Sequence, residues 1–140
     1  PSSGMTHTAL AVLGYATWTV ILLCGIFAHR GALILTGQRA LNTFSPHGTD
    51  VSPFGGRVVR AHANCVENLP VAGAVLLLAV ATAHTEVTEA LALPFLGARI
   101  AQSTAHLIST GTPAITVRFT FFLVQLAILT WWIVGLGMLL

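Results

Sequence analysis

ALAVLGYATWTVILLCGIFA, residues 9–28, contains twenty residues and no formal charge, and apolar residues resume after Arg30 as far as Leu35. About twenty apolar residues are what an α-helix needs to cross the hydrocarbon core of a bilayer. The run is too long for the apolar region of a signal peptide, and no cationic region precedes it. The sequence therefore predicts a membrane-spanning helix here.

The composition of the whole chain agrees with a membrane protein. Of its 140 residues, 55% are hydrophobic and 7% are charged, whereas a soluble domain has roughly 25% charged residues. All six basic residues are arginines scattered through apolar stretches, so they cannot form the contiguous basic face that binds nucleic acid. The cysteines and histidines lack the spacing of a disulfide framework or a metal site, and no metal is expected.

Three more apolar segments follow a loop between Thr36 and Gly56 that is dense in turn-forming residues. Each segment is close to the length that a bilayer requires. The predicted helices span residues 9–37, 57–83, 89–109 and 114–139. The sequence thus predicts an all-α membrane protein, a four-transmembrane-helix bundle forming one domain over residues 5–140. Residues 1–4, which precede Met5, are expected to be a remnant of expression outside the fold.

Arginines flank two of the three predicted connections, the first and the third: Arg39, Arg57, Arg60 and Arg118. The second connection carries the acids Glu86 and Glu89. Because cytoplasmic loops of membrane proteins are enriched in basic residues, the first and third connections are predicted to be cytoplasmic. Both termini are then expected on the opposite side of an integral, multi-pass membrane protein.

Polar residues follow helical spacing in two of the predicted helices. The second helix carries one stripe: Arg57, Arg60, Asn64 and Glu67. The third helix carries another: Arg99, Gln102, Ser103 and His106. Residues three and four apart lie on one face of a helix, and polar groups inside a membrane usually face the bundle interior and find partners there. The two stripes are therefore predicted to meet.

The depths of these residues predict how the antiparallel stripes pair. At about 1.5 Å per residue, Glu67 lies roughly 15 Å from Arg57, and Arg99 lies roughly 15 Å from Ser109. We therefore expect three pairs: Glu67 with Arg99, Asn64 with Gln102, and Arg60 with His106. Arg118 in the fourth helix is expected to close the site. The competing interpretation is that these groups only hold the helices together or extend to the membrane surface.

The residue types in the stripes favour a particular ligand. Arginines bind carboxylates through two parallel hydrogen bonds, a glutamate pairs with an ammonium, and the amides of Asn64 and Gln102 bind amide groups. A small zwitterionic peptide with an extra carboxylate fits this set. An arginine such as Arg118 beside a thiol would also favour the thiolate, which is the nucleophilic form.

RVVRAHANCVENLP, residues 57–70, resembles the second-helix signature of the membrane-associated proteins in eicosanoid and glutathione metabolism (MAPEG), and the resemblance extends over all four helices. It implies a homotrimer that binds glutathione between subunits near the cytoplasmic face. A lipophilic substrate then approaches from the membrane lipid. The implied activity is that of a glutathione transferase, a lipid hydroperoxide peroxidase, or both.

The resemblance also implies which residues act. Arg118 matches the arginine credited with stabilising the thiolate. The residues expected to bind glutathione are Arg39, Arg60, Asn64, Glu67, Arg99, Gln102 and His106. The chain departs from the family where His106 replaces a tyrosine late in the third helix and where Phe121 or Phe122 replaces one early in the fourth.

Two other functions are compatible with the sequence. One is a non-catalytic member of the family that keeps the fold for binding or structure. The other is a transporter that uses Glu67, Arg99 and His106 as a relay, although the chain lacks the inverted repeat that many transporters have.

Overall fold

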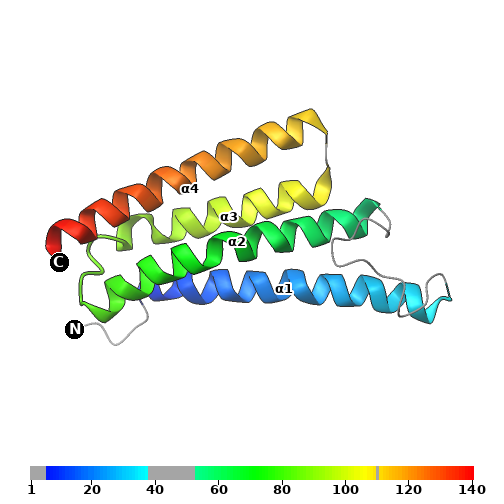
Figure 1. The fold of residues 1–140 in the computed structure, drawn as a ribbon, viewed down its shortest axis with the longest axis horizontal. Helices are drawn as coiled ribbons and strands as arrows, with labels where there is room; N and C mark the ends of the chain where they lie inside the picture. The colour runs from blue at the N-terminus through cyan, green and yellow to red at the C-terminus, as the bar shows by residue number, and fades with distance from the viewer. Residues whose placement is uncertain (1–5, 38–52, 110) are drawn as a thin grey trace.

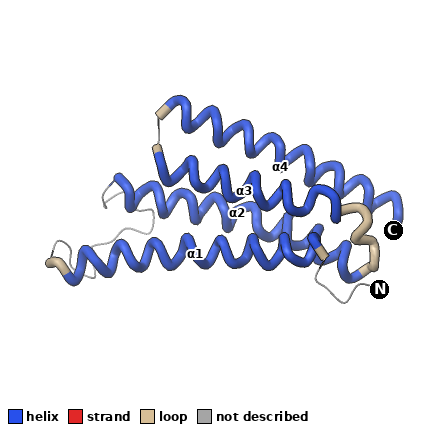
Figure 2. The backbone as a smooth tube through the Cα atoms, turned by 180° about the vertical axis from the view of Figure 1, so that it is seen from behind, coloured by secondary structure: helices blue, strands red, loops and turns tan. Residues whose placement is uncertain are grey.

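A computed structural model describes residues 6–37, 53–109 and 111–140. Within these ranges the chain forms four α-helices: α1 His7–Leu35, α2 Pro53–Ala81, α3 Glu89–Ile108 and α4 Thr112–Leu139. They run up and down as a bundle, with both termini at one end (Figure 1). The view from behind shows the same order of neighbours (Figure 2). Helix α1 packs against α2 and α3, and α4 packs mainly against α3.

The four predicted helices are present, with boundaries shifted by up to four residues. The largest shift is at α2, which begins at Pro53 and not at Arg57. The turn-forming residues before Arg57 made the predicted start too late. Proline is tolerated in the first turn of a helix, because the N–H group that it lacks would be unpaired there anyway. Pro113 likewise lies in the first turn of α4, which begins at Thr112, two residues before the predicted start at residue 114.

The outer surfaces of the helices are apolar, as expected for a protein in lipid. Phe27 is 66% exposed and Trp131 is 68% exposed, whereas the adjacent Trp132 is fully buried. Among the described residues, three helices are long and apolar enough to cross a membrane: His7–Leu35, Phe54–Ala81 and Thr112–Leu139. Helix α3 lies among them in the bundle, and its buried polar residues lower its hydropathy.

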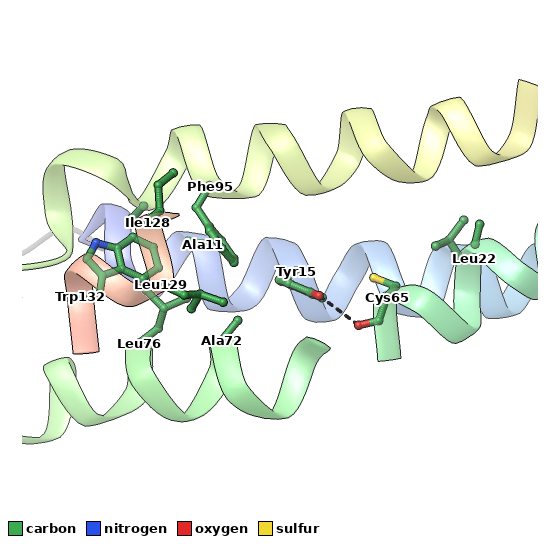
Figure 3. Close-up of a cluster of buried hydrophobic side chains, with 12 residues drawn as sticks. Ala11, Tyr15, Leu22, Cys65, Ala72, Leu76, Phe95, Ile128, Leu129 and Trp132 are labelled. Atoms are coloured by element: carbon green, nitrogen blue, oxygen red, sulfur yellow. Dashed lines mark hydrogen bonds between the residues drawn. The ribbon is translucent and has the colours of Figure 1, made fainter. Parts of the chain in front are cut away.

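The apolar core lies toward the end of the bundle that holds the termini. Trp132 packs against Phe95 with ring centroids 5.1 Å apart, and Leu76 and Leu129 complete the cluster (Figure 3). Farther along, the Tyr15 hydroxyl donates to the Cys65 carbonyl at 3.0 Å (Figure 3). These contacts fix α1, α2, α3 and α4 against one another next to the polar site.

A partly buried polar cluster closes the same end of the bundle, and we call Thr8, Thr88 and Glu89 the N-terminal clamp. Glu89 accepts hydrogen bonds from the His7 and Thr8 backbone N–H groups at 2.6 and 3.1 Å. Its Oε1 also accepts from the Thr8 hydroxyl, which meets Thr88 at 2.7 Å. A carboxylate at a helix N-terminus pairs otherwise unsatisfied N–H groups, so the clamp fastens the start of α1 to the start of α3.

Candidate functional site

The polar stripe of α2 divides between the inside and the outside of the subunit. Asn64 is half-buried and faces α3, whereas Arg60 and Glu67 are exposed. Arg57 Nε donates to the Leu107 carbonyl of α3 at 2.8 Å, so this arginine caps a helix end. The prediction that the stripe faces α3 is therefore correct for Arg57 and Asn64 only.

Four side chains from three helices form a closed ring of hydrogen bonds, which we call the amide ring: Asn64, Arg99, Gln102 and Gln125. Arg99 Nη1 donates to Asn64 Oδ1 at 2.5 Å, and Arg99 Nε donates to Gln125 Oε1 at 2.9 Å. Gln125 Nε2 donates to Gln102 Oε1 at 2.6 Å, and Gln102 Nε2 donates to Asn64 Oδ1 at 3.2 Å. The ring ties α2, α3 and α4 together at one level.

The predicted pairing of Asn64 with Gln102 is present in this ring, but the predicted pairing of Glu67 with Arg99 is wrong. Among the described residues the two form no ion pair, and Arg99 instead reaches Asn64. Glu67 lies on the outer edge of the α2 stripe, one turn beyond Asn64, so the Arg99 side chain meets the inner residue first. The third predicted pair, Arg60 with His106, forms no hydrogen bond within the described part of the chain.

Arg99 is a buried cation whose hydrogen-bond partners are neutral. The side chain is 1% exposed, and its guanidinium lies 5.7 Å from the centroid of the Tyr15 ring. Both acceptors are amide oxygens. A buried charge without a counter-ion is costly, so the site holds a positive charge that an anionic ligand would compensate.

A cavity of about 280 Å³ opens beside the amide ring, where α4 diverges from α3 toward their connection (Figures 1 and 2). Asn64, Gln102, His106 and Arg118 line it together with apolar residues of α4. His106 Nδ1 and Arg118 Nε are buried and have no hydrogen-bond partner among the described residues. Because buried polar atoms are nearly always paired, these two atoms point to a ligand in the cavity.

An apolar groove of about 360 Å³ lies between the same two helix ends, lined by residues such as Ala105, Ile108 and Val117. It uses other side chains of α3 and α4 than the polar cavity does. The same end of the bundle thus offers polar and apolar surfaces side by side, which suits the joining of a polar ligand to a lipophilic one.

The sequence prediction covered most of the residues at this site but not its geometry. Arg39 lies outside the described residues. Helical spacing places Gln125 on the same side of the fourth helix as Arg118, but Gln125 is not among the residues predicted from the sequence to bind glutathione. The sequence signal for Gln125 is weak. Its spacing of seven residues from Arg118 indicates a shared helix face but does not indicate which side chains Gln125 contacts.

The bundle and this cavity define a polytopic helical membrane protein with a cationic polar site near one end. The chain belongs to the MAPEG family, whose model matches residues 8–138 and so covers nearly the whole chain. No curated protein and no solved structure matches it. Family membership makes it a membrane protein of the glutathione and eicosanoid metabolism family.

Proposed function

We propose that this protein is a glutathione-dependent membrane enzyme that acts on lipophilic electrophiles, as a transferase, a lipid hydroperoxide peroxidase, or both. The single observation that carries the proposal is the cavity in which His106 Nδ1 and Arg118 Nε are buried without a partner among the described residues. MAPEG members use glutathione as a cosubstrate. Glutathione carries two carboxylates, and these suit a site whose buried charge is positive.

The binding roles follow the chemistry of each side chain. Asn64, Gln102 and His106 line the cavity and would hydrogen-bond the peptide. Arg60 and Arg39 would pair with carboxylates, and Arg99 would supply positive charge from behind the cavity wall. Glu67 would bind the ammonium group.

Arg118 is the residue proposed to stabilise the thiolate. The chain has one tyrosine, Tyr15, and its hydroxyl donates to the Cys65 carbonyl in the core, so no tyrosine is available to donate to sulfur. Arg118 is the cation that lines the cavity, and a nearby positive charge favours a thiolate over a thiol. The glutathione thiolate would attack the electrophilic carbon and form the carbon–sulfur bond, while the bond from that carbon to its leaving group breaks and the leaving group departs with the electron pair. The thiol proton would pass to water.

A homotrimer completes the proposed site. Arg60 and Glu67 are exposed on the outer face of α2, and charged side chains inside a membrane are costly unless they face other protein or water. A neighbouring subunit packed against α2 would cover them and close the open cavity. The substrate would then enter from the membrane lipid, with the loops after α1 and α3 on the cytoplasmic side. Cross-linking in native membranes tests this assembly, and a monomer there would contradict it.

The purified protein in detergent, titrated with glutathione and followed by ultraviolet absorbance, tests the function. Saturable binding with a rise in thiolate absorbance is the expected result. No binding at millimolar glutathione would reject the proposal. Binding without a thiolate signal would favour the alternative, a non-catalytic family member, which is consistent with His106, and Phe121 or Phe122, standing where the family resemblance places tyrosines.

A further inference from the structure

The amide ring holds three side-chain amides, each of which offers an oxygen at one end and an NH2 group at the other. Which end faces the cavity determines what the cavity binds: an NH2 group donates to carboxylate or carbonyl oxygens, whereas an oxygen would repel them. The orientation of each amide in the ring therefore carries functional information beyond the identity of the residue.

Arg99 sets these orientations because a guanidinium has donors and no acceptor. Its Nε and Nη1 atoms require an oxygen from Gln125 and an oxygen from Asn64. With its oxygen turned to Arg99, Gln125 must point its NH2 group away. Both of those N–H groups are used, one by Gln102 Oε1 at 2.6 Å and one by the Phe121 carbonyl at 3.0 Å.

The same logic fixes the remaining two amides. The Gln102 oxygen accepts from Gln125, so the Gln102 NH2 group faces Asn64 Oδ1. Arg99 requires the same Asn64 oxygen at this place. The chain of constraints closes without conflict. Turning over Gln125 alone would place its NH2 group against Arg99 and its oxygen against two other oxygens.

Of the three amide NH2 groups in the ring, Gln125 uses both of its N–H groups and Gln102 uses one, whereas the Asn64 NH2 group donates none of the ring's hydrogen bonds. Asn64 Nδ2 donates no hydrogen bond within the described part of the chain and is not among the fully buried unpaired atoms. Asn64 lines the 280 Å³ cavity, whereas Arg99 lines a separate cavity of about 30 Å³ with Gln125 and Phe95. Arg99 thus lies behind the ring and Asn64 in front of it.

We propose that Arg99 and Gln125 are positioning residues that act through the amide ring to keep the Asn64 NH2 group facing the cavity. The cavity then presents donors from Asn64 and Arg118 beside His106, and it accepts ligands through carboxylate or carbonyl oxygens. This proposal deepens the proposed function, because glutathione is the ligand that it would orient. It assigns Arg99 an indirect role in place of direct contact with the peptide.

Side-chain amide hydrogen exchange tests the polarity without any ligand. In protein labelled with 15N at asparagine and glutamine, the Gln125 NH2 group should exchange at least about tenfold more slowly than the Asn64 NH2 group, because both of its hydrogens are bonded inside the protein. Equal rates, or slower exchange at Asn64, would overturn the proposal whether or not the protein binds glutathione.

Two matched substitutions test the consequence for binding. Asn64→Asp keeps an oxygen for Arg99 and Gln102 but removes the donors at the cavity, so glutathione affinity should fall about tenfold or more while the unfolding temperature does not fall. Asn68→Asp makes the same chemical change one turn along α2, in the small cavity that Arg99 lines. It adds the same charge near Arg99 but removes no donor from the 280 Å³ cavity, so it should lower the affinity less than Asn64→Asp does. Unchanged binding by Asn64→Asp would overturn the proposal.

A third variant tests Gln125 itself. Gln125→Glu keeps an acceptor for Arg99 but cannot donate to Gln102, so the orientation of the ring is lost and affinity should fall about tenfold with the helical fold retained. Retained affinity in a folded Gln125→Glu protein would overturn the positioning role. If the unaltered protein binds no glutathione, the proposed function fails, and the amide exchange experiment still decides the polarity.

Discussion

Two polar clusters of the described residues, the partly buried N-terminal clamp and the buried amide ring, surround charge in opposite ways. The clamp buries part of a carboxylate, Glu89, and surrounds it with donors from the start of α1 and from Thr8. The ring buries a guanidinium, Arg99, and surrounds it with neutral amides. The clamp lies at the end of the bundle that holds the start of α1 (Figure 1). The ring lies beside the open cavity, nearer the connection from α3 to α4.

The difference shows how a structural cluster is told from a functional one. The clamp uses donors that a helix N-terminus offers in any case, so its hydrogen bonds are complete within one chain. Within the described residues, the Asn64 NH2 group of the ring donates no hydrogen bond, and His106 Nδ1 and Arg118 Nε at the adjacent cavity have no partner. Substitutions in the clamp should therefore change stability, and substitutions at the ring should change binding.

Arg118→Ala should give the largest effect, a loss of about 100-fold in thiolate formation or turnover, because it removes the charge that favours the anion. The peptide affinity should be partly retained, since other residues bind its carboxylates. Thiolate absorbance under saturating glutathione measures this loss. Arg118→Lys, which keeps the charge, should recover part of the signal, and a thiolate signal indifferent to both changes would reassign the role of Arg118.

Arg99→Met should separate binding from stability. We expect glutathione affinity to fall about tenfold or more, because the amide orientations and the positive charge are lost. The unfolding temperature should change little, because removing a buried cation that no carboxylate of the described residues pairs offsets the loss of the donors to Asn64 and Gln125. Thermal unfolding in detergent and glutathione titration measure the two effects. A protein that loses stability but keeps affinity would place Arg99 with the structural cluster.

The helices were predictable from the sequence because the bilayer makes simple demands on a chain. A helix must be long and apolar to span it, and residues 9–28 meet that demand without any knowledge of neighbours. Family membership over residues 8–138 agrees with the resemblance seen at residues 57–70. The same demands do not fix where a helix starts, so α2 begins at Pro53 and not at Arg57.

The internal order of the site was only partly predictable. Helical spacing correctly placed Asn64 opposite Gln102, because a register follows from antiparallel geometry and rise per residue. Helical spacing predicted the wrong partner for Glu67. The polar stripe of α2 is about 80° wide, so one edge faces the bundle interior and the other faces outward, and spacing alone does not tell which edge is which. The amide ring depends on rotamers and on α4, so Gln125 could be recognised only in three dimensions.

Gly135→Ala should cost about 1 to 3 kcal/mol of stability through overpacking. A Cβ at Gly135 would lie 2.9 Å from Val87 Cγ1, and valine has little rotamer freedom to yield. This contact holds the turn before the clamp against α4. Gly137→Ala is the matched control, because no atom lies within 4 Å of a Cβ there. Equal unfolding temperatures for the two variants would show that the close packing at Gly135 is not required.

Glu89→Gln should give the smallest effect, a loss of about 0.5 kcal/mol in stability, because an amide oxygen still accepts one N–H of α1 but the charge at the helix N-terminus is gone. Glutathione binding should be unchanged, since the clamp lies at the opposite end from the cavity. Glu86→Gln is the control: Glu86 is exposed, and its hydrogen bond with His84 at 3.0 Å holds the pKa of this carboxyl below its usual value. Faster amide exchange at the start of α1 in Glu89→Gln, but not in Glu86→Gln, is the expected result. A loss of glutathione affinity in Glu89→Gln would contradict the division between the two clusters, because it would couple the clamp to the site across the length of the bundle.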